Sequence, residues 1–300
     1  MVSNLEELIE QFNQKNINVF LTTNATLLNP ARSLRLIKSG VKGIFFSVES
    51  ASEAINDEIR GKGTFHIFYE NIKNFMSIYL TLRKKNYIPS LRPALSCTVS
   101  SLNFSTDTSI QKMFSFAQEL GISDITFNFL VDYGGCKNLI YNKEMTNFEL
   151  ANQIVRISKE FPEIYVRLPM KQIEHDFLKK RYGLDVNIYG AKGSCPAGDG
   201  VAYVDAELNM YPCIWLAHKE QRNRLATENT VSLYGDVPLT MFASFMEKKQ
   251  KCITVFQECS TCKYKNKCIP VCPCQENSEI MECMGKACPT RKEIREYHHE

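Results

Sequence analysis

Apolar residues recur along the first half of the chain with two different spacings. Within residues 4–14, Leu5, Leu8, Ile9 and Phe12 share one face of a helix whose first turn is acidic. Short runs of apolar and β-branched residues instead indicate buried strands. Such runs predict strands at residues 18–23, 43–49, 92–100 and 124–131, and a further one within 163–168.

Helical patterns occupy the intervals between these strands. Pro at the first helical position and Gly just past the last one mark the helix ends, and a capping box starts the last helix. Strands separated by helices of ten or more residues imply parallel pairing through right-handed crossovers, so the predicted fold is an α/β sheet or barrel. The predicted helices are Pro30 to Gly40, 64–85, 106–120, and Thr146 to about residue 161, the last with Glu149 completing its capping box.

Small polar residues gather at the carboxyl ends of four predicted strands, which read TTNAT, SVESA, CTVSS and VDYGG. In parallel α/β folds, binding and catalysis collect at this edge of the sheet. Ordinary loop composition explains the same residues equally well. The pattern alone therefore locates a candidate site without identifying its ligand.

The amino-acid composition and the hydrophobic pattern change after residue 185. Four glycines occur within 190–200, and the segments VAYVD and MYPCIWL are typical of the two strands of a hairpin. We therefore place a domain boundary near residue 185. The predicted domains are an α/β sheet or barrel over 1–185 and a small cysteine-rich domain over 186–300.

Composition excludes several classes of protein. The 300 residues are 44% hydrophobic and 23% charged, which is typical of a globular chain with room for two domains. No apolar run reaches the ~18 residues of a membrane span, and the acidic start MVSNLEELIEQF lacks the features of a signal peptide. The expected location is cytoplasmic. A net charge of +3 gives no argument for nucleic acid as a partner.

Twelve cysteines are the unusual number, and ten of them follow residue 194. In a chain without an export signal, dense cysteine favours metal binding over disulfides. A CxxC pair followed closely by two more cysteines is typical of a metal centre, although the spacing alone leaves a zinc module and an iron-sulfur site both open. The run comprises Cys259, Cys262, Cys268 and Cys272.

The order Cys195, Cys213, CxxCxxxxxCxxxC and a last distant cysteine resembles the seven-cysteine SPASM domain of radical SAM enzymes. The first domain resembles the partial (β/α)6 barrel of the same enzymes. VFLTTNATLL resembles their third strand, and GIFFSVESASEAINDEIRGKGTF resembles their fourth strand with its following turn. The resemblance implies a radical SAM barrel that lacks its first strands, joined to a SPASM domain with a β-hairpin.

The resemblance also implies a set of ligands for two auxiliary 4Fe-4S clusters. Cys195, Cys213 and Cys272 would hold the first cluster, and Cys259, Cys262, Cys268 and Cys288 the second. Three points stay open. The fourth position of the first cluster could be filled by Cys252 or Cys274 or be left open, and Cys283 is a rival to Cys288. Leu208 occupies a hairpin position where the family usually has Gly, which suggests a different turn.

The defining CxxxCxxC loop of radical SAM enzymes is absent from this sequence. That loop holds the 4Fe-4S cluster that binds S-adenosylmethionine, so the chain as it stands is not expected to cleave this cofactor. A late start within a longer enzyme and a shortened relative without radical chemistry are the two explanations. We favour the late start, because a half-barrel exposes the edge of its first strand.

Part of the binding site for S-adenosylmethionine would remain in a chain that lacks the CxxxCxxC loop. The family resemblance places Ser47 near the ribose of S-adenosylmethionine, matches Asn24 to the third-strand motif, and directs Arg60 toward the cofactor carboxylate. Each residue also has a purely structural interpretation. Ser47 can cap a turn, Asn24 can form an Asx-turn, and Arg60 can be a solvated charge at a helix end.

The resemblance implies a maturase that modifies a peptide or protein side chain, with a ferredoxin or flavodoxin as electron donor. Sulfatase-maturing relatives have an acidic residue after the second SPASM cysteine, whereas this chain has Ile214, which favours peptide maturation. Cys136 is a candidate substrate-side thiol or a packing residue. The alternative function is a non-catalytic zinc or iron-sulfur module that docks a partner protein.

Overall fold

A computed structural model describes residues 4–87, 91–100, 102–104, 106–129, 147–170, 172–183, 187–188, 195–217, 230–233, 242–252 and 261–262. The chain divides into two compact units. The first contains Met1–Pro169 and Tyr182–Asn187, and the second contains Met170–Arg181 and Ile188–Glu300. The assignment of 1–185 to a barrel and of 186–300 to a SPASM domain stays a prediction.

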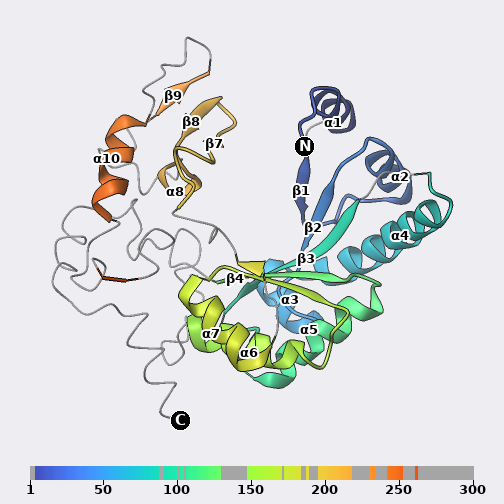
Figure 1. The fold of residues 1–300 in the computed structure, drawn as a ribbon. Helices are drawn as coiled ribbons and strands as arrows, with labels where there is room; N and C mark the ends of the chain where they lie inside the picture. Colours follow the sequence, from blue (N-terminus) through green and yellow to red (C-terminus); the bar gives the residue numbers. More distant parts are fainter. Residues whose placement is uncertain are drawn as a thin grey trace. The chain divides into compact units, whose positions relative to one another are not determined.

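The first unit is built on a sheet in which each strand lies beside the next one along the chain (Figure 1). The pairs from β1 to β5 are all parallel. Among the described residues no pairing joins β6 to β1, so the sheet is open. The predicted α/β partial barrel is confirmed. The strands are β1 Phe20–Thr23, β2 Gly43–Ser47, β3 Arg92–Val99, β4 Asp124–Phe129, β5 Tyr165–Leu168 and β6 Asn187–Ile188.

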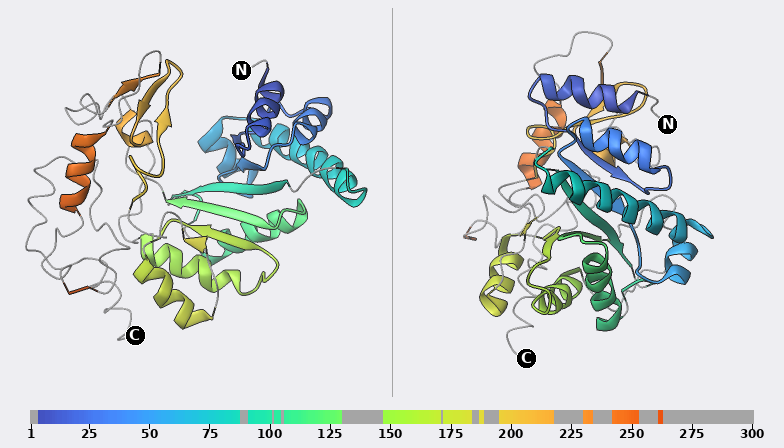
Figure 2. Two further views of the ribbon diagram at one scale, coloured as in Figure 1. Left: turned by 45° about the horizontal axis from the view of Figure 1, so that its top comes forward. Right: turned by 90° about the vertical axis from the view of Figure 1, so that its right-hand side faces the viewer.

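Helices connect these strands and cover one face of the sheet, as the two views of Figure 2 show. The helices predicted from the sequence are present, and α2 begins as expected, with Asn29 accepting a hydrogen bond from the backbone N–H of Arg32. None of the described helices is long and apolar enough to cross a membrane. The described helices of the first unit are α1 Leu5–Gln14, α2 Pro30–Lys38, α3 Glu53–Arg60, α4 Thr64–Lys84, α5 Asp107–Glu119 and α6 Asn147–Ser158, whereas α7 Gln172–Tyr182 belongs almost entirely to the second unit.

The two faces of the sheet differ in polarity. Phe46 of β2 is fully buried beneath α4, where its ring meets Phe75 edge to face at 5.3 Å, and Phe127 of β4 packs on Phe114 of α5. Because side chains alternate along a strand, the next residues point to the opposite face. There Ser47 and Ser96 are register partners and only partly buried. The sheet therefore has an apolar face under the helices and a polar face opposite.

The described residues of the second unit form a three-stranded antiparallel sheet and two further helices besides α7. The predicted hairpin is present as β7 Tyr203–Val204 and β8 Asn209–Tyr211, and β9 Val231–Ser232 pairs with β8. The prediction of a strand through Ile214 is wrong, because α8 Ile214–Ala217 follows directly. Pro212 has no N–H to donate to a ladder and ends β8. The other helix is α10 Ala243–Cys252, which the sequence analysis did not predict.

Leu208 keeps the turn of this hairpin in a glycine-like conformation. Its φ is +61°, in the left-handed region that a side chain disfavours by about 1 kcal/mol. Asp205 closes the turn, since its Oδ1 accepts the N–H groups of Glu207 and Asn209 at 3.0 and 2.8 Å. Leucine therefore adopts the left-handed backbone conformation that glycine adopts most readily.

Candidate functional site

A cavity of about 330 Å³ lies at the carboxyl ends of β1 and β2, beside α3 and the start of α4. It contains all three residues predicted to contact the cofactor, Asn24, Ser47 and Arg60. They come from three separate elements of the first unit, and the fold brings them together. The cavity is lined by Asn24, Thr26, Ser47, Glu49, Asn56, Ile59, Arg60, Thr64 and Phe68.

Each predicted residue has a defined local role in the wall of this cavity. Asn24 forms an Asx-turn, because its Oδ1 accepts from the backbone N–H and the hydroxyl of Thr26 at 3.3 and 3.0 Å. Ser47 is the last residue of β2 and is partly buried. Arg60 is the last residue of α3 and pairs with a carboxylate rather than with solvent alone. The Asx-turn interpretation of Asn24 holds, and the residue also lines the cavity.

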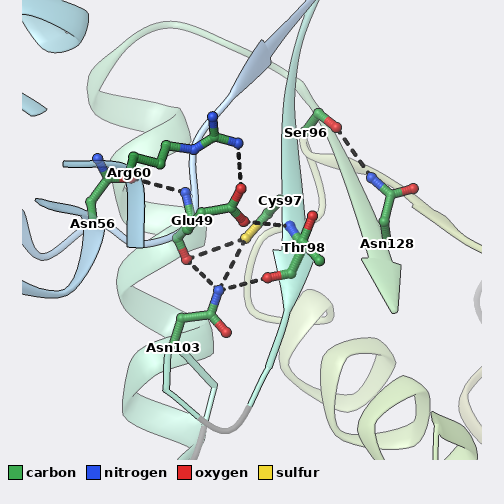
Figure 3. Close-up of polar contacts among 8 residues, drawn as sticks. All are labelled: Glu49, Asn56, Arg60, Ser96, Cys97, Thr98, Asn103 and Asn128. Carbon is green, nitrogen blue, oxygen red and sulfur yellow. Dashed lines mark hydrogen bonds and ion pairs between the residues drawn. The ribbon is translucent and has the colours of Figure 1, made fainter. Parts of the chain in front are cut away.

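Glu49, which the sequence analysis did not select, organises this part of the site (Figure 3). Its residue is only 5% exposed, and one carboxylate oxygen accepts from Arg60 Nη2. The other oxygen accepts the backbone N–H of Thr98 at 2.8 Å, just before the end of β3. A buried carboxylate is stable when its oxygens are hydrogen-bonded and its charge is paired. Glu49 meets both conditions and joins β2, α3 and β3.

Two asparagines hold the backbone of Glu49 in place. Asn56 Oδ1 accepts the Glu49 N–H at 3.0 Å, and Asn103 Nδ2 donates to the carbonyls of Glu49 and Thr98, each at 2.7 Å. Both asparagines are buried. The only sequence signal for Asn103 is its place in the polar segment after a strand, which does not distinguish it from ordinary loop residues.

Cys97 lies beneath this network as a fully buried thiol. Its Sγ donates to the Glu49 carbonyl at 3.4 Å. Burial raises the pKa of the Cys97 thiol well above its ordinary value, the negative charge of Glu49 adds to the rise, and Arg60 partly offsets it. Since the thiolate is the reactive form, Cys97 is a protonated packing residue and not a nucleophile.

The loop between α3 and α4 borders the cavity and depends on Asp57. Its Oδ1 accepts the N–H of Phe65 at 2.8 Å, and its Oδ2 accepts the N–H of Gly63. The Phe65 hydrogen bond is the main reason that the pKa of Asp57 lies below its ordinary value, and Gly63 and Thr64 contribute in the same direction. A lowered carboxyl pKa means that this cap stabilises the loop at neutral pH and is lost as the pH falls through the lowered pKa.

A second charged cluster lies at the opposite, amino-terminal ends of the strands. Asp124 is 6% exposed and accepts from Arg92, whose Nε is 2.7 Å away, while Arg167 Nη2 lies at 3.5 Å. The Arg167 guanidinium also lies over the ring of Phe45, 5.7 Å from its centroid. In α/β barrels this end of the strands serves stability rather than catalysis. We assign the Asp124 cluster a structural role.

Two of the predicted cluster ligands meet on one core in the second unit. Cys195 and Cys213 are half-buried and pack against a core of Ala197, Tyr211, Leu216, Phe242 and Phe245. The segments that carry them are joined where Gly198 N–H donates to the Pro212 carbonyl at 3.2 Å. Two thiols brought to one core from separate segments form a donor set that fits part of a metal-thiolate centre.

The roles assigned to the other cysteines stay predictions. Cys262 is described and half-buried, and within the described ranges no group of three potential ligands is assembled. Cys252 ends α10, and nothing further is described for its side chain. Seven cysteines lie outside the described residues: Cys136, Cys259, Cys268, Cys272, Cys274, Cys283 and Cys288.

The chain is similar to known proteins in both sequence and fold. Residues 1–84 match the family model of the radical SAM superfamily. This radical SAM segment contains α1 to α4, β1 and β2, and with them every lining residue of the cavity. No curated protein matches the chain.

Solved structures extend the likeness in fold beyond the radical SAM segment. The chain resembles Streptococcus suis SuiB bound to S-adenosylmethionine at 14% identity and a TM-score of 0.66, covering 96% of this chain and 63% of SuiB. SuiB bound to its precursor peptide SuiA is similar at 13% identity and a TM-score of 0.52, over 71% of this chain and 46% of that one. The chain thus has the fold of SuiB over slightly less than two thirds of SuiB's length.

Proposed function

We propose that this chain is part of a radical SAM peptide maturase with a SPASM-type domain. One observation carries the proposal: Asn24, Ser47 and Arg60, selected from sequence alone, line a single cavity at the carboxyl edge of a sheet with the SuiB fold. Ligands of α/β folds bind at this edge. SuiB itself has been solved with S-adenosylmethionine, and the cavity described here is the matching candidate site in this chain.

The cavity residues suit the polar groups of S-adenosylmethionine. The Ser47 hydroxyl can donate to or accept from a ribose hydroxyl. Arg60 has five N–H donors, and Glu49 engages its Nη2, so the guanidinium keeps donors for a carboxylate. Glu49 fixes the direction of that guanidinium, and the Asn24 turn forms another part of the cavity wall. When bound next to a reduced cluster, S-adenosylmethionine supplies the radical chemistry.

The cysteine-rich part is proposed to hold two auxiliary 4Fe-4S clusters. Cys195, Cys213 and Cys272 are the proposed ligands of one cluster, and the remaining four predicted ligands hold the other. The shared core beneath Cys195 and Cys213 supports the first set. Auxiliary clusters accept an electron or bind substrate, according to potentials that charge, hydrogen bonds and burial set. A ferredoxin or flavodoxin is the proposed electron donor.

A peptide is the proposed substrate. The similar protein SuiB has been solved with its precursor peptide SuiA, which supports a peptide-modifying reaction in this chain as well. The partly buried polar residues Ser96, Thr98 and Asn128 on the polar face of the sheet offer hydroxyl and amide groups to a peptide backbone. Ile214 after Cys213 argues against formylglycine formation and favours crosslinking of side chains.

The radical step of this proposal requires a CxxxCxxC loop, which these 300 residues do not contain. We expect the in-frame sequence upstream of Met1 to encode about seventy residues, or two strand-helix units, with this loop. A protein that includes them should form 5'-deoxyadenosine from S-adenosylmethionine under reducing, anaerobic conditions. The 300-residue chain alone should form none, and Arg60→Met should lower the yield of the longer protein at least tenfold.

Arg83→Met, at the end of α4 and away from the cavity, is the matched control and should leave the yield unchanged. The proposal is wrong if the longer protein holds its loop cluster and still cleaves no S-adenosylmethionine. It is also wrong about the cavity if Arg60→Met behaves like Arg83→Met.

A further inference from the structure

Lys249 is the one lysine of the described residues that is buried, with only 4% of its side chain exposed. It belongs to α10, between the core residue Phe245 and the helix end. Removing an ammonium group from water costs several kcal/mol unless charges and hydrogen bonds compensate. A lysine in this place therefore requires a specific partner, because a methionine of similar length would pack without that cost.

The contacts of Lys249 lie on the loop that follows Cys195. Its Nζ donates to the carbonyl of Ala197 and to Asp199 Oδ1, each at 3.0 Å. Ala197 is two residues from Cys195. The Asp199 side chain is about half exposed, at 52%, so this carboxylate offsets the buried charge only in part. The ammonium is thus directed at the backbone that carries a proposed cluster ligand.

The same loop is closely fitted to α10 at a second point. Gly198 has a φ of +81°, and a Cβ at this position would come within 3.1 Å of Met246 Sδ and Phe245 Cδ1. The loop is closed internally, since the Pro196 carbonyl accepts the N–H groups of Gly200 and Val201 at 2.7 and 2.9 Å. Lys249 and Gly198 together fix the Cys195 loop against one side of α10.

We propose that Lys249 is a positioning residue for the Cys195 metal-thiolate centre. It holds the Cys195 loop in place and sets a positive charge at the Ala197 carbonyl, two residues along the chain from Cys195. This inference rests on the proposed function, because it assumes that Cys195 and Cys213 bind a cluster. A cluster with thiolate ligands carries net negative charge, which a nearby ammonium offsets, more so after the cluster accepts an electron. The charge therefore raises the reduction potential of that cluster.

The test compares Lys249→Met with Lys249→Arg and with Lys251→Met, an exposed lysine of the same helix. Hydrogen exchange measures loop positioning. The amides of Gly200 and Val201 should exchange at least tenfold faster in Lys249→Met, because a buried charged hydrogen bond is lost. Electron paramagnetic resonance during a redox titration measures the charge, and Lys249→Met should lower the potential of one auxiliary cluster. Lys249→Arg should restore both values, and Lys251→Met should match the parent.

Two failures are distinguishable in this experiment. If the parent protein holds no iron-sulfur cluster, the proposed function fails. If the parent holds its clusters and Lys249→Met shows parental exchange rates and potentials at equal iron content, the inference about Lys249 fails alone. Faster exchange with an unchanged potential also overturns it, because that result leaves Lys249 a structural role only.

Discussion

Replacing Glu49 with Gln is expected to lower the free energy of unfolding of the first unit by about 3 kcal/mol. The Glu49 carboxylate accepts from Arg60 and from the Thr98 N–H, whereas a glutamine side chain has one carbonyl oxygen for these two donors. The amide NH2 would face a donor, and Arg60 would lose its counter-charge. Urea unfolding followed by far-UV circular dichroism measures the change.

Glu53→Gln is the matched control, because Glu53 is exposed in the first turn of α3 and belongs to the same connection. Its loss should cost about 0.5 kcal/mol through the helix dipole alone. Hydrogen exchange measures the effect on a single hydrogen bond. The Thr98 amide should lose its protection from exchange in Glu49→Gln and keep it in Glu53→Gln. Equal stability of the two variants would contradict the role assigned to Glu49.

Replacing Asp124 with Asn is the other change with a large expected effect. Asp124 is the shared acceptor for Arg92 and Arg167, and the Arg167 side chain is only 16% exposed. Breaking a buried ion pair by removing one partner costs about 3 to 5 kcal/mol, and the 45% exposure of the Arg92 side chain reduces this figure. We expect a loss of about 2 to 3 kcal/mol in the same urea experiment.

Asp107→Asn provides the comparison for this prediction. Asp107 pairs with Arg156 Nη2 at 2.6 Å, but both side chains are 46% exposed. Exposed pairs contribute little, so the loss should stay below about 1 kcal/mol. The structural role of the Asp124 cluster is refuted if Asp124→Asn is as stable as Asp107→Asn.

The sequence predicted the central strands β2, β3 and β4 well because most of their residues are buried. A strand such as GIFFS must be apolar to fit beneath α4, so its pattern is visible without the structure. Helix α3 was missed because its eight residues lie among Ser, Asn and Gly residues typical of turns. Helix α10 was missed because three lysines and a glutamate interrupt its apolar face, and one of those lysines proves to be buried.

The sequence predicted individual residues of the candidate site but not the hydrogen bonds that hold the site together. Asn24, Ser47 and Arg60 follow from motifs at strand ends, and the fold gathers them around one cavity. Glu49 and Asn103 carry no such signal, because the hydrogen bond between them joins residues 54 positions apart. The left-handed conformation of Leu208 is likewise not evident from the sequence, because a leucine rarely adopts it.

The metal content of the chain after anaerobic purification tests the central claim most directly. Two auxiliary 4Fe-4S clusters predict about eight iron and eight sulfide ions per chain, with visible absorption that bleaches in air. Cys195→Ser together with Cys213→Ser should remove about half of the iron. One or two zinc ions per chain, with no sulfide and no visible absorption, would contradict the account and favour a zinc module that docks a partner protein.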